Sequence, residues 1–558
     1  MTKPPILRCG VLSRLRVARV AGAPLLLLTC LFPRVALAQS AAHSCESVTQ
    51  LRLPNTTITL AQTVGAGAFR PPTPPGSAAP APDTVRAFGG LPTFCRVAAT
   101  LKPSSDSDIK VEVWLPVSGW NGKFRGIGNG GFAGTINVGG LADALSRNYA
   151  TASADTGHEA TSGPPNAEWA LHHPEKIVDF GYRAIHETAV SAKAIIRAFY
   201  GEDPKWSYFD SCSNGGRQAL MEAQRYPGDY DGIVAGAPAN DWTHLLSFAT
   251  SNVKAMLTET ESYIPAAKLP AIEAAALTAC DASDGVKDGV IENPLTCRFD
   301  PTVLLCKGTE SASCVTRPQL VALQALYGGL KGPDGRMVFP GYSPGGEAEA
   351  GGWAPWITGD APEKSLMFAF GTQFFKNMVF DDASWPFRSF DAVRDLKVAD
   401  RKMARALNAT DPDLSAFRKR GGKLVLFHGW SDAAIPPVST INYYQSVVAK
   451  AGAPQAGDFV RLYMVPGMQH CGGGAGPNSF GQLVTTRGDR MHDIDAALDA
   501  WVEQSIAPDQ IIASKYRGAP GLGGEVVRTR PLCPYPQVAS YKGSGSIDDA
   551  ANFICKAR

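Results

Sequence analysis

The chain has 558 residues, more than one ordinary domain needs, and its apolar content of 44% is that of a globular protein. Its net charge of +2 gives no basic stripe, so nucleic acid is not expected as a partner. After the N-terminal segment, no apolar run is long enough to span a bilayer, which excludes a membrane span. We therefore expect a core domain with a large insertion or a partner domain.

The N-terminus has the pattern of a cleaved signal peptide. Basic residues precede a short apolar segment over residues 21–32, and Ala36-Leu37-Ala38 forms an A-x-A cleavage site. We predict a signal peptide at residues 1–38, a mature chain that begins at Gln39, and a secreted or periplasmic protein. A lipid anchor at Cys30 and an uncleaved anchor are the alternatives.

Strand-like and helix-like segments alternate in the first half of the mature chain. Residues 108–115 alternate polar and apolar positions, as a half-buried strand does, and residues 174–200 form an amphipathic helix with Pro at its start. The other predicted elements are strands at 124–127, 149–153, 206–210 and 232–237, a tight turn at 211–216 and a helix at 217–225.

The alternation stops at about residue 240 and resumes after about residue 406. Buried strands are predicted at 423–428 and 459–465, and a helix at about 491–505. Alternating strands and helices indicate a mostly parallel sheet covered by helices on both faces. We predict a core domain in two parts, 39–239 and 407–558, with a lid domain inserted at 240–406.

Ser213 is the candidate nucleophile. It lies between a predicted strand and a predicted helix, in Ser211-Cys212-Ser213-Asn214-Gly215-Gly216. A nucleophilic serine needs a sharp turn with small neighbours, usually G-x-S-x-G, and here Ser211 replaces the first glycine. A turn that only packs a helix against a strand is the alternative for this motif alone.

Asp432 and His470 are the candidate partners of Ser213. Each follows a predicted buried strand, at the end of a parallel sheet where such sites lie, and the chain order Ser, Asp, His is that of α/β-hydrolases. His470 would take the serine proton, and Asp432 would orient the imidazole. A helix N-cap is the alternative for Asp432. His158, His186 and His428 are expected to be structural.

Two further donors are expected to hold an oxyanion. One is the backbone N–H of Asn214, after the nucleophile, and the other comes from the glycine loop at 128–131, at Gly130 or Gly131. A phosphate-binding loop is the alternative for these glycines, but neither G-x-G-x-x-G nor a Walker lysine follows.

The cysteines indicate disulfides. Removal of the leader with Cys9 and Cys30 leaves ten of the twelve cysteines, an even number in an exported chain. If Ser213 and His470 meet, their neighbours Cys212 and Cys471 come within bonding distance. Proximity along the chain suggests the pairs Cys280–Cys297, Cys306–Cys314 and Cys533–Cys555, which leaves Cys45–Cys95 and Cys212–Cys471.

An acidic loop in the predicted lid suggests a cation. Asp281, Asp284 and Asp288 are spaced with glycines, and three carboxylates on one short loop repel unless something neutralises them. A hard cation such as Ca²⁺ does so, and the carbonyls of Val286 and Val290 would complete its ligands. A solvated turn is the alternative. We expect the calcium ion to be structural.

The chain resembles the tannase and feruloyl esterase family over nearly its whole mature length. The matching motifs are Trp120-Asn121-Gly122, Gly128-Asn129-Gly130-Gly131-Phe132, Asp155-Thr156-Gly157-His158, Trp169-Ala170, Pro174-Glu175-Lys176, Asp179-Phe180-Gly181-Tyr182-Arg183-Ala184, Cys212-Ser213-x-Gly215-Gly216-Arg217, Asp231-Gly232-Ile233, Gly236-Ala237-Pro238-Ala239, Gly429-x-x-Asp432 and His470-Cys471.

The resemblance implies an α/β-hydrolase fold with a Ser213, Asp432 and His470 triad, an active-site disulfide Cys212–Cys471, and the lid calcium site at Asp281, Asp284, Val286, Asp288 and Val290. It implies esters of aromatic acids as substrates, feruloyl-type esters first, with gallate esters and terephthalate monoesters as alternatives. A peptidase, a thioesterase or a non-catalytic protein that binds phenolics or carbohydrate are the other possibilities.

Substrate selectivity is expected to lie in the lid. Arg388 is a candidate partner for a substrate carboxylate, although nothing singles it out. The aromatic residues that either clamp an acyl ring or fill the lid core are Trp353, Trp356, Phe368, Phe370, Phe374, Phe375 and Trp385.

Overall fold

Nine strands of the described chain form one sheet in the computed structural model, in the order β1-β2-β3-β5-β4-β6-β7-β10-β11. The model describes residues 44–71, 88–160, 163, 165–482, 488–518 and 524–557, so the predicted leader lies outside the described residues. The strands are β1 (Thr56–Val64), β2 (Phe94–Leu101), β3 (Ile109–Pro116), β4 (Lys123–Ile127), β5 (Ala150–Ala154), β6 (Trp206–Cys212), β7 (Gly232–Gly236), β10 (Lys423–Gly429) and β11 (Val460–Val465).

The sheet is parallel from β5 to β11 and antiparallel at its other end. β5, β4, β6, β7, β10 and β11 pair in parallel, whereas β1, β2 and β3 pair antiparallel and β3 joins β5. This is the predicted mostly parallel sheet. β1 and β2 have no counterpart among the predicted elements, because their threonines and alanines give a weak apolar alternation.

Helices cover both faces of the sheet, so the side chains on both faces of the central strands are apolar and buried. In β10, Leu424 and Leu426 join one buried cluster while Val425 and Phe427 join another. Because side chains alternate along a strand, a strand buried on both faces is a continuous apolar run. The helices over the two faces are α4 (Ala184–Tyr200), α5 (Asn214–Arg225) and α13 (Val438–Ala451) on one, and α2 (Val138–Ser146) and α15 (Ile494–Gln504) on the other.

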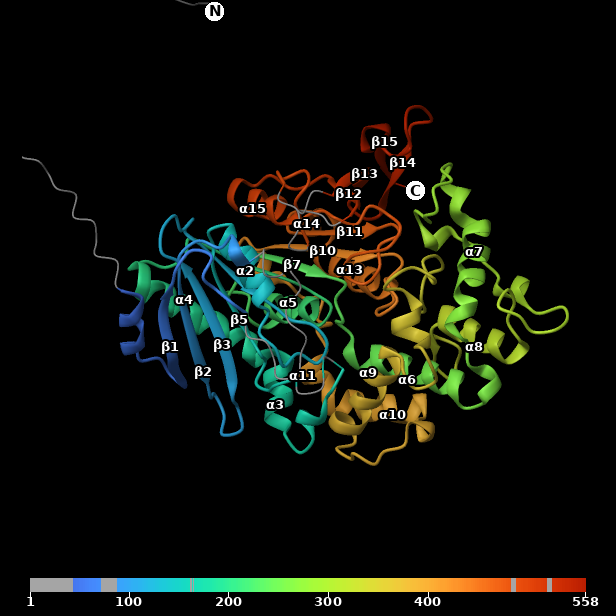
Figure 1. Cartoon of the computed structure of the whole chain (residues 1–558), viewed down its shortest axis with the longest axis horizontal. Helices are drawn as coiled ribbons and strands as arrows, with labels where there is room; N and C mark the ends of the chain where they lie inside the picture. The colour runs from blue at the N-terminus through green and yellow to red at the C-terminus, as the bar shows by residue number, and fades with distance from the viewer. Residues whose placement is uncertain are drawn as a thin grey trace, which may run out of the picture. The chain divides into compact units, whose positions relative to one another are not determined.

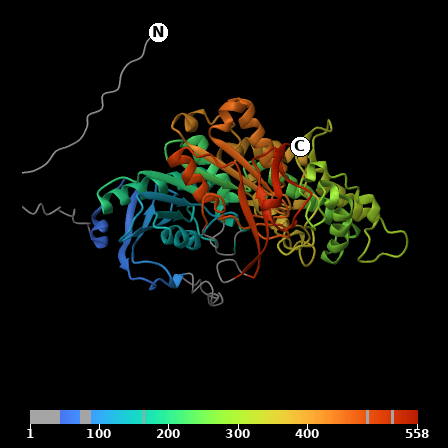
Figure 2. The same cartoon turned by 90° about the horizontal axis from the view of Figure 1, so that it is seen from above.

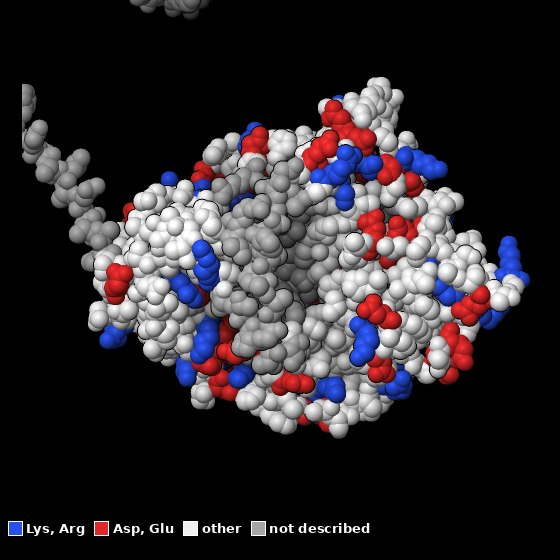
Figure 3. All heavy atoms as spheres, in the orientation of Figure 1, with Lys and Arg blue, Asp and Glu red and all other residues white. Residues whose placement is uncertain are grey.

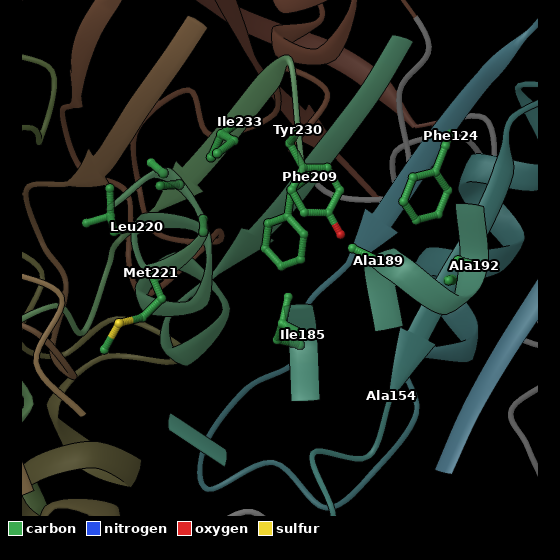
Figure 4. Close-up of a cluster of buried hydrophobic side chains, with 14 of the residues drawn as sticks. Phe124, Ala154, Ile185, Ala189, Ala192, Phe209, Leu220, Met221, Tyr230 and Ile233 are labelled. Carbon is green, nitrogen blue, oxygen red and sulfur yellow. The ribbon is translucent and has the colours of Figure 1, made fainter. Parts of the chain in front are cut away.

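Figure 4 shows the first of these clusters in the gap between sheet and helices. Phe209 and Ile233 from β6 and β7 lie close to Ile185 of α4 and Leu220 of α5, and all four belong to the same buried cluster. Burial of each such side chain contributes roughly 1.5–3 kcal/mol. This apolar packing therefore holds α5 in place, together with the turn that precedes α5.

The predicted helix at 174–200 is interrupted. It consists of α3 (Pro174–Val178), a π-helical turn η3 (Asp179–Arg183) and α4. A Cβ on Gly181 would lie 2.3 Å from the carbonyl oxygen of Ala406, so glycine is required there. The carbonyls of Phe180 and Gly181 accept hydrogen bonds from the buried guanidinium of Arg217. The π-helical turn thus holds the side chain of Arg217, which belongs to α5.

The chain between β7 and β10 forms a helical unit whose buried apolar cluster also includes residues of the core, such as Phe132 and Phe180. Figures 1 and 2 show α7 and α8 of this unit at the opposite end of the molecule from β1–β3. Its elements are α6 (Trp242–Leu257), α7 (Leu269–Cys280), α8 (Arg317–Gly328), β8 (Leu330–Lys331), β9 (Met337–Phe339), α9 (Leu366–Phe374), α10 (Ala392–Ala399), α11 (Arg405–Leu407) and α12 (Ser415–Lys419).

The C-terminal part adds a short helix and two antiparallel strand pairs that no pattern predicts. These are α14 (Ala453–Gly457), then β12 (Ile511–Arg517) with β13 (Glu525–Leu532), and β14 (Gln537–Tyr541) with β15 (Phe553–Ala557). No helix among the described residues has the length and apolarity needed to cross a membrane. Acidic and basic side chains are interspersed on the face in Figure 3.

Candidate active site

Ser213 occupies a strained turn between β6 and α5. Its backbone φ is +69°, which lies in a region that residues other than glycine rarely adopt. The turn needs small neighbours, because a Cβ on Gly215 would lie 1.8 Å from Oγ of Ser211 and one on Gly216 would lie 2.3 Å from the carbonyl oxygen of Gly236. The geometry is that of a nucleophile elbow, with Ser211 accommodated in place of the usual glycine.

The structure brings Ser213, His470 and Asp432 together. The Ser213 hydroxyl lies 2.9 Å from Nε2 of His470, and Nδ1 of His470 lies 2.8 Å from Oδ2 of Asp432. With Nδ1–H donating to the carboxylate, Nε2 is left as the acceptor for the serine proton. The three residues follow β6, β10 and β11; β10 and β11 are neighbours in the sheet, and β7 lies between β6 and β10, so all three lie at the same edge of the parallel sheet.

Asp432 is held as an anion inside the protein. Its Oδ1 accepts the backbone N–H groups of Ala434 and Ile435 at 2.7 and 2.9 Å. Burial alone would raise the pKa of Asp432, but electrostatic attraction to His470 and hydrogen bonds from His428 and His470 keep that pKa well below its ordinary value. Asp432 is not a helix N-cap, because α13 begins only at Val438.

A second network joins the elbow to the glycine loop. Asn214 donates from Nδ2 to the carbonyl of Asn129, and Asn129 donates from its own Nδ2 to the carbonyl of Ala154. Arg217 donates to Oδ1 of Asn214, and burial lowers the pKa of Arg217 to about 9. Asn129 and Arg217 are positioning residues that sequence patterns missed, although both lie in the motifs of the family resemblance.

The predicted oxyanion donors face the cavity at Ser213. Gly130, Gly131 and Asn214 all line it, and a Cβ on Gly130 would meet nothing within 4 Å. Within the described part of the chain their backbone N–H groups donate to no protein acceptor. They are therefore free to bind an oxygen of a bound molecule.

The cavity has a volume of about 740 Å³, within the range of small-molecule sites. Of the predicted lid aromatics, Trp356 and Phe370 line it, and the Trp356 indole lies edge-on to the His470 ring at 5.0 Å. Other apolar walls come from residues that no motif marks, namely Trp242, Leu245, Leu246, Ala249, Tyr342, Leu366 and Met367.

The remaining predicted lid candidates lie outside the cavity. Phe368 packs against Phe387, and Arg388 contacts the Leu257 carbonyl and Glu363 at the surface. The others are buried in the lid cluster: Trp353, Phe374, Phe375 and Trp385.

The described residues form five disulfides, in the pairs that the sequence suggests. Cys212–Cys471 joins the elbow to the histidine loop across 259 positions, with its Cα atoms 6.0 Å apart. The others are Cys45–Cys95, Cys280–Cys297, Cys306–Cys314 and Cys533–Cys555.

Replacement of both Cys212 and Cys471 by serine is expected to lower kcat by about 100-fold, because small misplacements of reacting groups cost that much. The loss should exceed any loss of folded protein at the assay temperature, which a thermal melt checks. The control removes Cys306–Cys314, which closes only 8 positions in the lid. Equal activity of both double variants would contradict a role for the Cys212–Cys471 disulfide in positioning Ser213.

The acidic loop has suitable oxygens but does not form a closed cation site. Asp281 accepts N–H groups of Asp288 and Gly289, and the Asp288 carboxylate pairs with Arg530 and Arg528. Among the described residues, one group of three metal-binding side chains has its ligand atoms within 4.8 Å, and it is elsewhere, at His186, Glu222 and Asp229. The carboxylate oxygens of Asp281, Asp284 and Asp288 therefore do not all lie within 4.8 Å of one another.

The carbonyls predicted as ligands are nevertheless available. Val286 and Val290 are buried, and neither carbonyl accepts a hydrogen bond from another described residue. Asp284 accepts the N–H of Val286, and Asp288 accepts the N–H of Val290, so both carboxylates are tied to the backbone of the residues whose carbonyls are predicted as ligands. The donor set suits a hard cation once the carboxylates converge.

The parallel sheet, the elbow at Ser213 and the histidine and aspartate at neighbouring strand ends define an α/β-hydrolase. Residues 95–556 match the family model described as tannase and feruloyl esterase. The chain belongs to this family and is a carboxylic ester hydrolase.

Named relatives agree with this assignment. An uncharacterized esterase of Xanthomonas campestris pv. campestris is 45% identical over 543 residues, covering 92% of each chain. A probable feruloyl esterase B-2 of Aspergillus terreus is 34% identical, covering 83% of this chain and 86% of its own. The crystal structure of feruloyl esterase B from Aspergillus oryzae superposes with a TM-score of 0.82 at 28% identity, covering 92% of this chain and 99% of its own.

Proposed function

We propose that the protein is an exported serine esterase that hydrolyses esters of hydroxycinnamic acids. The observation that carries the proposal is the contact of the Ser213 hydroxyl with His470, which contacts Asp432, at the wall of an apolar cavity. Ser213 attacks the ester carbonyl while His470 takes its proton, and His470 then protonates the leaving alcohol. Water activated by His470 next attacks the acyl-enzyme, which releases the acid and restores Ser213.

The backbone N–H groups of Asn214 and of Gly130 or Gly131 are the proposed oxyanion hole. Support comes from their position beside Ser213 and from their lack of acceptors among the described residues. Donors that are held in place before the reaction stabilise the negative charge of the tetrahedral intermediates without reorganisation. The Asn214–Asn129 hydrogen bond keeps the two sides of the hole together.

The cavity wall favours a mainly apolar aromatic acyl group. Trp242, Trp356, Met367 and Phe370 offer flat or polarisable apolar surface to a ring and its side chain. A gallate ester would bring three phenolic hydroxyls to this wall, and polar groups buried without partners cost free energy. A ferulate ester brings fewer hydroxyls and an apolar methoxy group, so it loses less.

A terephthalate monoester brings a second carboxylate, which needs a cation. Arg125 is the one Lys or Arg among the described residues that line the cavity, and it is paired with Asp495. Arg388, the sequence candidate, lies at the surface instead. This charge pattern supports a neutral acyl group over a carboxylated one.

We expect kcat/KM for methyl ferulate to exceed that for methyl gallate and for mono(2-hydroxyethyl) terephthalate by about tenfold or more, the scale on which pocket contacts discriminate. The three substrates are compared with one enzyme preparation, with Ser213→Ala as the blank. A gallate or terephthalate preference would replace the hydroxycinnamate proposal and leave the esterase mechanism standing. Hydrolysis of amides or thioesters in preference to oxygen esters would overturn the esterase proposal.

Export and a structural calcium ion are the two remaining proposals. Five disulfides support an oxidising compartment, because such bonds are rare in reducing ones. The calcium proposal rests on the Asp281, Asp284 and Asp288 carboxylates and on the free carbonyls of Val286 and Val290. The ion would hold a lid loop, and it takes no part in the chemistry at Ser213.

Removal of calcium is expected to lower the melting temperature by several degrees, since an ion that binds only the folded state adds about 2.7 kcal/mol at a hundred times its Kd. The measurement is a thermal melt with and without a chelator. Asp284→Asn should melt lower and no longer respond to the chelator. Asp300→Asn, a lid aspartate that caps a short helix outside the loop, should still respond. A wild type without a chelator response would contradict the calcium proposal.

A further inference from the structure

A second histidine contacts the carboxylate of the proposed triad. Nε2 of His428 lies 3.0 Å from Oδ2 of Asp432, the same oxygen that Nδ1 of His470 contacts at 2.8 Å. His428 is fully buried at the end of β10, with none of its surface exposed. The sequence predicts only a structural role for it. Oδ2 of Asp432 therefore faces two imidazoles, and Oδ1 faces two backbone N–H groups.

The partners of His428 determine which of its nitrogens carries the proton. Nε2 also faces the carbonyl oxygen of Ile435 at 3.0 Å, so both of its partners are acceptors. A lone pair on Nε2 would point at a carboxylate and a carbonyl, which is repulsive, so Nε2 carries a hydrogen. Nδ1 lies 2.7 Å from the Thr440 hydroxyl in α13, which is therefore able to donate to it.

Thr440 makes this tautomer the stable one. Its hydroxyl is fully buried, and no other partner is seen for it among the described residues. If the imidazole carried its hydrogen on Nδ1 instead, Nε2 would lose both of its hydrogen bonds. A buried polar group without a partner is costly, so the chain Thr440, His428, Asp432 has one favourable direction.

We propose that His428, held in its tautomer by Thr440, is a positioning residue for Asp432. The inference rests on the triad proposed above. His428 donates to Oδ2 and so prevents the carboxylate from rotating or taking up a proton as His470 moves toward and away from Ser213. It holds the orientation of the carboxylate through this hydrogen bond, while His470 contacts the Ser213 hydroxyl.

The contacts around this pair exclude a simpler packing role for the ring nitrogens. A residue needed only for its shape would tolerate an apolar side chain of similar size. Both ring nitrogens of His428 are instead engaged: Nε2 by Asp432 and the Ile435 carbonyl in the loop after β10, and Nδ1 by Thr440 in α13. Hydrogen bonding and shape are therefore separable by substitution.

The test compares variants that keep or remove each hydrogen bond. Thr440→Val keeps the shape and removes the donor to Nδ1; we expect kcat to fall about tenfold, the scale of one buried hydrogen bond. Thr440→Ser restores the hydroxyl and should return kcat to within about threefold of wild type. His428→Leu should lower kcat by about 100-fold with little change in KM, and His428→Gln, whose amide can donate to Asp432, should recover part of that loss.

Thr188→Val is the matched control, because Thr188 is also buried but donates only to the carbonyl of Ala184 within α4. It should lose stability without losing kcat. All variants are assayed below their melting temperatures, together with the rate at which a fluorophosphonate labels Ser213. A loss of kcat shared by Thr440→Val and Thr440→Ser, or full activity in Thr440→Val and His428→Leu, would overturn the inference. An inactive and unlabelled wild type would instead overturn the proposed triad.

Discussion

Ser213→Ala is expected to lower kcat for a hydroxycinnamate ester by at least about 10⁴-fold, as the loss of a triad nucleophile does in other serine hydrolases. The hydroxyl at 2.9 Å from His470 is the one group here placed to form an acyl-enzyme. Its removal leaves the oxyanion donors and the cavity in place, so substrate should still bind. The measurement is steady-state turnover, together with a binding assay for the ester.

The stability of the variant separates chemistry from folding. Alanine at position 213 keeps the positive φ of the elbow and relieves no crowded contact. The melting temperature should therefore stay within a few degrees of wild type. Ser207→Ala, at a buried position on β6, the strand that leads to Ser213, is the control and should retain kcat. If Ser213→Ala kept most of its activity, the proposed nucleophile would be wrong.

Asp432→Asn is expected to lower kcat by about 10⁴-fold, the cost of holding the triad histidine in the wrong tautomer. The amide brings one NH₂ group into a site where every neighbour donates. Whichever way it turns, it meets either the two imidazoles at Oδ2 or the backbone N–H groups of Ala434 and Ile435 at Oδ1. One set of donors is left without an acceptor.

This variant should also be less stable than wild type, by about 1–3 kcal/mol for the unsatisfied donors. Urea unfolding measures the loss, and the residual activity is measured where the variant is fully folded. Asp411→Asn, a surface aspartate in the chain before β10, is the control. Loss of stability with kcat near that of wild type would show that Asp432 organises the loop but does not orient His470.

The geometry around Ser213 could be predicted because its constraints are local. Small residues around Ser213 are required by a turn that a Cβ would block, and the order of Ser213, Asp432 and His470 follows from parallel strands whose ends meet. The cysteines beside Ser213 and His470 added a distance constraint between distant segments. Each of these signals is readable in a few adjacent letters.

The cavity wall and the supporting contacts could not be predicted in the same way. Trp242 and Tyr342 reach the cavity through lid packing, and Trp353 and Phe374, equally aromatic, are buried away from it. Only the tertiary arrangement separates these cases. His428 shows the same limit: its spacing from Asp432 is visible in the sequence, but the contact with Thr440 depends on how α13 packs on β10.

Covalent labelling is the sharpest test of whether Ser213 is the nucleophile of an esterase. The folded, oxidised protein is treated with a fluorophosphonate, and the modified residue is located by peptide mass spectrometry. We predict one label per chain, on Ser213, with loss of activity in proportion to labelling. An active enzyme that remains unlabelled, or a label on another residue that accounts for the inactivation, would contradict the account.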